Sequence, residues 1–69
     1  MSTTYKWYEL ITDTKWAYAI FETGEIVAVI NYTAGMYSAT KYIDPITTVE
    51  LGNFVYLSNA KIEVEKVFR

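Results

Sequence analysis

The chain contains no histidine and no cysteine among its 69 residues, and it has only one proline and three glycines. Without cysteine it has neither disulfide bonds nor a zinc site with thiolate ligands, the two kinds of cross-link that usually stabilise a small domain. Without histidine, no serine or threonine hydroxyl has the imidazole base of a hydrolytic triad. Three scattered glycines form no phosphate-cradling loop. We therefore expect a protein that is not an enzyme and that holds neither a metal nor a cofactor.

Long apolar runs and a surplus of basic residues are also missing. A membrane helix needs roughly 20 consecutive apolar residues, whereas the longest run here extends only from Trp16 to Phe21. The first residues show no charged region followed by an apolar stretch, so no secretory signal is predicted. Six basic residues against eight acidic ones give a net charge of −2, which argues against nucleic acid as the partner. We expect a cytoplasmic protein with no membrane association, located in the host cytoplasm if a phage encodes it.

Apolar side chains, by contrast, are abundant. They make up 52% of the sequence, and twelve residues are aromatic. A chain this short removes only about 60% of its unfolded surface from water on folding. Because no repeat, linker or low-complexity stretch divides the sequence, we expect a single domain over residues 1–69. Its core must be purely hydrophobic or completed by a second chain.

Alternating apolar residues separated by turn signals predict an antiparallel β-meander of four to five strands. The turn at Glu22-Thr23-Gly24-Glu25 marks the clearest hairpin, because glycine tolerates a positive φ. Asp44-Pro45 ends the fourth strand, because the residue before a proline is restricted and proline cannot donate to a ladder. The segments predicted as strands are Tyr5–Thr12, Trp16–Phe21, Ile26–Tyr32, Met36–Ile43 and a short fifth, Ile46–Leu51.

Residues 58–69 fit either a strand or a helix. As a strand, Ile62 and Val64 alternate with charged residues. As a helix, the segment begins with Ser58 and Asn59, which are common at helix starts, and its apolar residues form one stripe. The stripe comprises Leu57, Ala60, Val64, Val67 and Phe68, and the charge pairs across a turn are Glu63 with Lys66 and Glu65 with Arg69. We predict the helix, which gives an α+β fold: a meander with one C-terminal helix packed on one face of the sheet.

The segment Leu51-Gly52-Asn53-Phe54, followed by Leu57 and Ala60-Lys61, resembles the end of small meander-plus-helix domains. Among these are the plant ethylene-response DNA-binding domains and the arm-binding domains of tyrosine integrases. The resemblance implies that Gly52 permits a sharp turn at the end of the last strand and that the ring of Phe54 packs against the sheet. It also implies that the small side chain of Ala60 lets the helix pack close to the sheet. Those families carry Arg and Lys on the sheet for DNA, whereas this sheet offers Tyr18, Ile20, Ala28 and Ile30. Only the order of strands and helix is therefore carried over.

The function is predicted from surplus apolar surface. One helix covers one face of a sheet, yet both faces of the first three strands carry apolar residues. We therefore expect the second face to be buried against another chain, most simply a second copy in a homodimer. The expected function is a protein-protein interaction module, such as a phage or mobile-element accessory protein that binds and inhibits a host factor. The alternatives are a nucleic-acid-binding sheet of the integrase-arm kind and a structural subunit of a larger assembly.

Two groups of residues are candidates for binding the partner. Tyrosines suit interfaces because they bury a ring while the hydroxyl stays in water, and acidic residues beside turns suit a basic target surface. The tyrosines are Tyr5, Tyr8, Tyr32, Tyr37 and Tyr42, and the acids are Asp13, Glu22, Glu25, Asp44 and Glu50. The aromatic residues assigned to the core are Trp7, Trp16, Tyr18, Phe21, Phe54 and Phe68.

Overall fold

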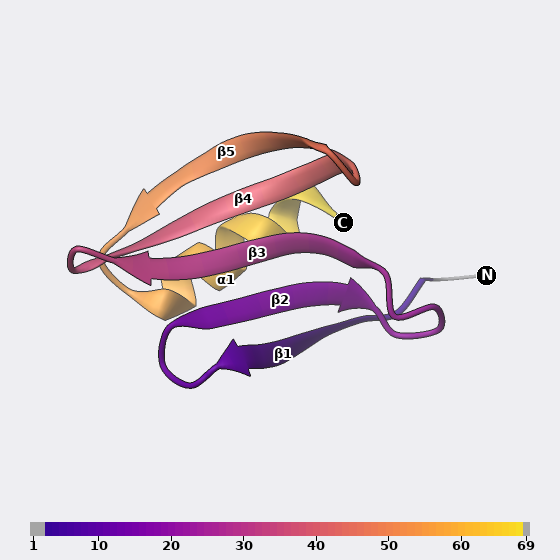
Figure 1. The fold of residues 1–69 in the computed structure, drawn as a ribbon, viewed down its shortest axis with the longest axis horizontal. Coiled ribbons are helices and arrows are strands. Elements are labelled where there is room, and N and C mark those ends of the chain that lie inside the picture. The colour runs from indigo at the N-terminus through magenta and orange to yellow at the C-terminus, as the bar shows by residue number, and fades with distance from the viewer. Residues whose placement is uncertain (1–2, 69) are drawn as a thin grey trace.

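Five strands follow one another along the chain and lie side by side in the same order, so each pairs with its neighbour in sequence (Figure 1). The computed structural model describes residues 3–68. The pairings are antiparallel, as tight turns between successive strands require. The elements are β1 (Tyr5–Ile11), β2 (Lys15–Ile20), β3 (Ile26–Thr33), β4 (Met36–Asp44), β5 (Thr47–Phe54) and α1 (Leu57–Val67). The predicted α+β meander with one C-terminal helix is confirmed, including the fifth strand.

The hairpin between β2 and β3 turns at Gly24, as predicted. Gly24 has a φ of +77°, a conformation that glycine adopts without the clash of a Cβ atom. Its N–H donates to the carbonyl of Ile20 at 2.7 Å, and the Thr23 hydroxyl accepts from the N–H of Glu25 at 3.2 Å. The turn thereby places Glu25 directly before the first residue of β3.

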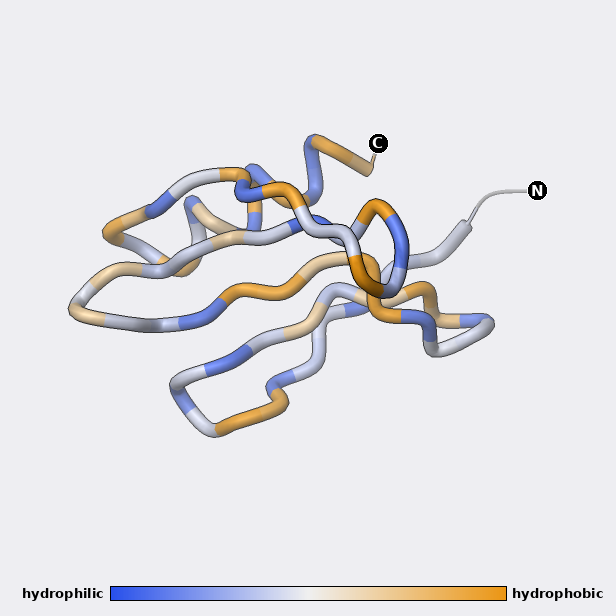
Figure 2. The backbone as a smooth tube through the Cα atoms, turned by 45° about the horizontal axis from the view of Figure 1, so that its top comes forward, coloured by the Kyte–Doolittle hydropathy of each residue, from blue (hydrophilic) through white to orange (hydrophobic). Residues whose placement is uncertain are grey.

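Helix α1 packs over β3, β4 and β5 on one face of the sheet, which is the far face in Figure 1. Ala60 and Val64 are fully buried on its inner side, and the most hydrophobic stretch of the sheet runs along the central strand β3 (Figure 2). Over β1 and β2 the core is extended by aromatic rings instead. Tyr18 lies at the centre of this group, with ring centroids 4.6 Å from Trp7 and 5.9 Å from Phe68. Helix α1 and the aromatic rings over β1 and β2 together cover one face of the sheet.

The start of α1 differs from the prediction. The cap residue is Tyr56, in an extended conformation and without a side-chain hydrogen bond, whereas Ser58 and Asn59 lie inside the first turn. The sequence pattern for a cap was therefore wrong by two residues. The pair between Glu63 and Lys66 is confirmed at 3.8 Å. The predicted pair of Glu65 with Arg69 involves a residue outside the described range.

Strand β5 runs through Gly52 and Asn53 to Phe54, so the prediction that it ends at Leu51 was too short. Gly52 has a φ of +135° and lies at a shift in register, where its pairing with Ala39 gives way to that of Glu50 with Thr40. Glycine therefore permits a bulge within the strand and not an exit from it. Phe54 packs against the core as predicted.

A second bulge reverses one side chain of β3. The pairing passes from Tyr18 with Ala28 to Ala19 with Ile26, which leaves Val27 as an extra residue. In an unbroken strand Ile26 would lie on the face of Ala28, whereas the bulge turns it to the opposite face, where it is 40% exposed. The core assignment of Phe21 was also wrong, because its side chain is 54% exposed in the turn after β2.

Candidate functional site

The face of the sheet opposite α1, here called the open face, faces the viewer in Figure 1 and is covered by no element of residues 3–68. Ala17 and Ala19 of β2 form its floor and are only 1% and 2% exposed, because larger side chains rise around them. A hollow of about 250 Å³ lies over this floor, lined by Tyr8, Leu10, Ala17, Ala19, Gly24 and Ile26. Small residues in the centre and large apolar residues at the rim thus shape an apolar groove.

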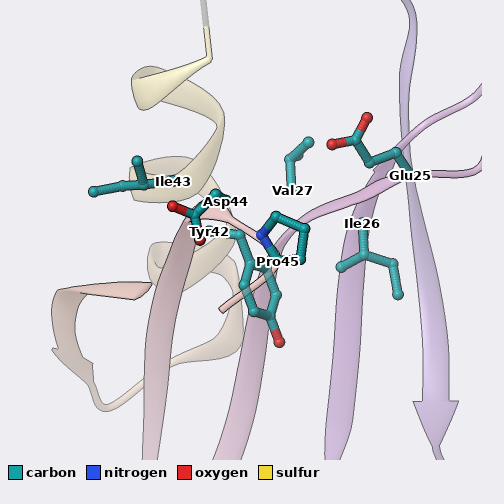
Figure 3. Close-up of a pocket in the computed structure, with 7 residues that line it drawn as sticks. All are labelled: Glu25, Ile26, Val27, Tyr42, Ile43, Asp44 and Pro45. Carbon is teal, nitrogen blue, oxygen red and sulfur yellow. The ribbon is translucent and has the colours of Figure 1, made fainter. Parts of the chain in front are cut away.

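A second hollow lies where the sheet divides. The pairing of β3 with β4 ends at Ala28 and Lys41, whereas β3 stays paired with β2 as far as Ile26, and β4 stays paired with β5 as far as Asp44. Strands β3 and β4 therefore separate at this end of the sheet (Figure 1). We call the hollow of about 280 Å³ between them the fork; it is lined by Glu25, Ile26, Val27, Tyr42, Ile43, Asp44 and Pro45 (Figure 3). Because Ile26 lines both hollows, the groove and the fork are adjacent.

Two carboxylates flank the fork and differ in their surroundings. The Oδ1 atom of Asp44 accepts hydrogen bonds from the N–H groups of Ile46 at 3.0 Å and Thr47 at 2.8 Å. The bond from Ile46, with those from Thr47, holds the pKa of Asp44 below its ordinary value, although desolvation acts in the opposite direction. The carboxylate of Glu25 makes no hydrogen bond or ion pair with any residue from 3 to 68. Within residues 3–68, one negative charge is therefore held by a turn and the other has no partner.

The structure separates the five candidate tyrosines. Tyr8 lines the groove on the open face, and Tyr42 lines the fork. Tyr5 and Tyr37 instead pack against the core on the helix side of the sheet. Tyr32 lies beside Tyr37, with ring centroids 4.7 Å apart, and is 41% exposed. Only two of these tyrosines are thus placed at the candidate site.

The acidic candidates are separated in the same way. Glu25 and Asp44 both line the fork, and Glu22 lies in the adjoining turn, where it accepts from the N–H of Thr4 at 3.1 Å. Asp13 is in the turn between β1 and β2, at the opposite end of the sheet, and Glu50 lies within β5, paired with Thr40. The five acids therefore form no single acidic surface.

The sequence analysis did not identify Ile26, Val27, Ile43 and Pro45 as lining residues of a site. It had named three other lining residues, Glu25, Tyr42 and Asp44, as separate candidates for binding a partner, and Asp44-Pro45 as the end of a strand. The fork depends on where pairing between β3 and β4 stops, which is a contact between segments distant in sequence.

No family model, curated protein or solved structure matches the chain. The resemblance to meander-plus-helix DNA-binding domains stays confined to Leu51–Lys61. Among the described residues no three acidic, histidine or cysteine side chains are grouped to hold a metal ion. In the same range no helix has both the length and the apolar character needed to cross a bilayer. The groove and the fork are therefore the features from which a function is inferred.

Proposed function

We propose that this protein is a non-enzymatic interaction module that binds another protein chain through its open face. One observation carries the proposal: α1 covers a single face, while Tyr8, Leu10 and Ile26 on the other are 43%, 47% and 40% exposed around a buried alanine floor. Large apolar side chains grouped on an uncovered face are unfavourable in water and commonly mark interaction sites. Buried against a partner, the same groove stabilises a complex.

The dimensions of the molecule suit a protein partner. Its principal extents are 38 × 22 × 21 Å, and the open face lies across the two longer axes (Figure 1). A standard protein interface removes about 800 Å² of surface from each partner. A footprint of this size is therefore sufficient for a specific complex.

A second copy is the simplest partner, because a two-fold contact requires only one apolar surface. A host factor, bound and inhibited by this chain acting as a phage or mobile-element accessory protein, would occupy the same face. The net charge of −2 and the apolar groove favour either of these over nucleic acid.

The test compares the wild type with Leu10→Glu and Ile62→Glu by sedimentation at micromolar concentration and by affinity capture from the native host. Leu10 lines the groove, whereas Ile62 is a similarly exposed apolar residue on α1, 51% exposed against 47%. We expect Leu10→Glu to abolish self-association or capture of a specific partner, and Ile62→Glu to leave either unchanged. A wild-type monomer that captures no partner, or equal effects of the two substitutions, would contradict the proposal.

A further inference from the structure

The fork is large enough to admit a single large side chain. Its volume of about 280 Å³ lies below the range of roughly 300–1,000 Å³ typical of small-molecule sites. It opens at the end of the sheet, beside residues such as Ile43 that are largely exposed. A side chain presented by another protein can therefore enter from solvent without displacing any element.

The walls of the fork combine apolar surface, an aromatic ring and negative charge. Ile26 and Val27 supply aliphatic surface, and the ring of Tyr42 lies on the same side of the hollow as Pro45, whereas the side chain of Ile43 points away from them. In Figure 3 the carboxylates of Glu25 and Asp44 stand on opposite sides of the hollow, with Val27 and Pro45 between them. Lysine and arginine match this combination, because their methylene stems favour apolar surface and their heads favour aromatic faces and carboxylates.

No cation of the described chain neutralises the fork. Within residues 3–68 the ion pair found is that of Lys66 with Glu63 on the outer side of α1. The ammonium groups of Lys6 and Lys41 lie over other rings, 4.8 Å from the centroid of Phe21 and 5.9 Å from that of Phe68. Asp44 is already held by the turn amides, so it needs no rearrangement to meet a charge. Among residues 3–68, therefore, no cation is placed to occupy the fork, which leaves it open to a cation of another molecule.

We propose that the fork binds one lysine or arginine side chain of the partner protein, with its methylenes against Ile26 and Tyr42 and its cationic head between Glu25 and Asp44. This inference rests on the proposed function, because the partner that covers the open face supplies the side chain. Ile26 lines both hollows, so an interface over the groove lies directly beside the fork.

The test is an NMR titration of the ¹⁵N-labelled protein with the amides of Nα-acetyl-lysine and Nα-acetyl-arginine, and with that of Nα-acetyl-norleucine as the uncharged control. We expect the two basic probes to shift the backbone amides of residues 25–27 and 42–44, with dissociation constants in the millimolar range. The norleucine probe should bind several-fold more weakly. Glu25→Gln should weaken the basic probes about threefold, as expected for one exposed charge pair. The matched control Glu22→Gln lies in the same turn but does not line the fork, and it should bind like the wild type.

Three results would overturn this inference: norleucine binding as well as lysine, Glu25→Gln binding like the wild type, or no shift at either group of amides. Because the side chain of Glu25 makes no hydrogen bond or ion pair with residues 3–68, its substitution leaves the fold intact and the result interpretable. Failure of the proposed function has a different signature. If the basic probes bind the fork while the wild type stays monomeric and captures no protein, the side-chain site stands and the interaction module fails.

Discussion

The indole Nε1 of Trp7 donates a hydrogen bond of 2.9 Å to the carboxylate of Glu65, which joins β1 to α1 across 58 residues of chain. One helical turn earlier, the ammonium group of Lys61 lies 5.4 Å from the centre of the Trp7 ring. Helix α1 packs mainly over β3, β4 and β5. These two contacts therefore help to tie the first strand, at the edge of the sheet, to the last element of the fold.

Glu65→Ala is expected to lower the free energy of unfolding by about 1 kcal/mol, the usual contribution of a partly buried hydrogen bond. Glu63→Ala is the matched control, because it makes the same change on the same helix and removes only an exposed pair with Lys66. Such a pair contributes less than about 0.5 kcal/mol. Urea unfolding followed by tryptophan fluorescence measures both. Equal losses would show that the Trp7 contact does not stabilise the fold.

The bulge at Gly52 should make this position intolerant of any side chain. A Cβ atom there would be 3.5 Å from the ring of Phe54, an ordinary contact, so the strain comes from the φ of +135°. We expect Gly52→Ala to destabilise the protein by about 2 kcal/mol. Gly35→Ala, at a φ of +80° near the left-handed region, should lose only about 1 kcal/mol. Thermal unfolding of the two variants decides the matter, and an equal or smaller loss for Gly52→Ala would contradict it.

The order of the strands and the presence of the helix could be predicted because their signals are local. Gly24 permits the positive φ of the turn before β3, and Asp44-Pro45 stops β4. The alternation of large and small residues in β2 is itself visible in the sequence, and it separates Trp16 and Tyr18 from Ala17 and Ala19 on the opposite face. Each of these signals lies within a few residues of the feature it predicts.

The fork could not be predicted, because it depends on contacts between distant segments. The extra residue Val27 shifts Ile26 to the open face, and a shift of one residue reverses every side chain beyond it. Nothing in the sequence around Ile26 marks that position as a bulge. For the same reason the acidic candidates could be named from the sequence, but the sequence did not show that Glu25 and Asp44 line the same hollow.

The depressed pKa of Asp44 predicts how the turn between β4 and β5 responds to acid. A carboxyl whose pKa is lower in the folded state stabilises the fold above its unfolded pKa of about 3.9, and this contribution is lost as the pH falls through the folded value. In an NMR pH titration, the amides of Ile46 and Thr47 should therefore shift with a midpoint below that of an ordinary aspartate. In Asp44→Asn, whose amide oxygen can still accept both bonds, this titration should disappear while the turn persists. A midpoint at or above the ordinary value would contradict the role assigned to the two bonds.

A final prediction separates side chains that serve folding from those that serve binding. Ile30 is fully buried on the helix side, so Ile30→Ala should lower the free energy of unfolding by about 2–5 kcal/mol. Leu10 is 47% exposed on the open face, so Leu10→Ala removes about half of a buried contact and should lose only about 1 kcal/mol. Binding should change in the opposite order, because Leu10 lines the groove whereas Ile30 does not. Urea unfolding combined with sedimentation measures both quantities on the same samples. A large loss of stability in Leu10→Ala with unchanged association would mean that the open face is part of the folding core and that the partner lies elsewhere.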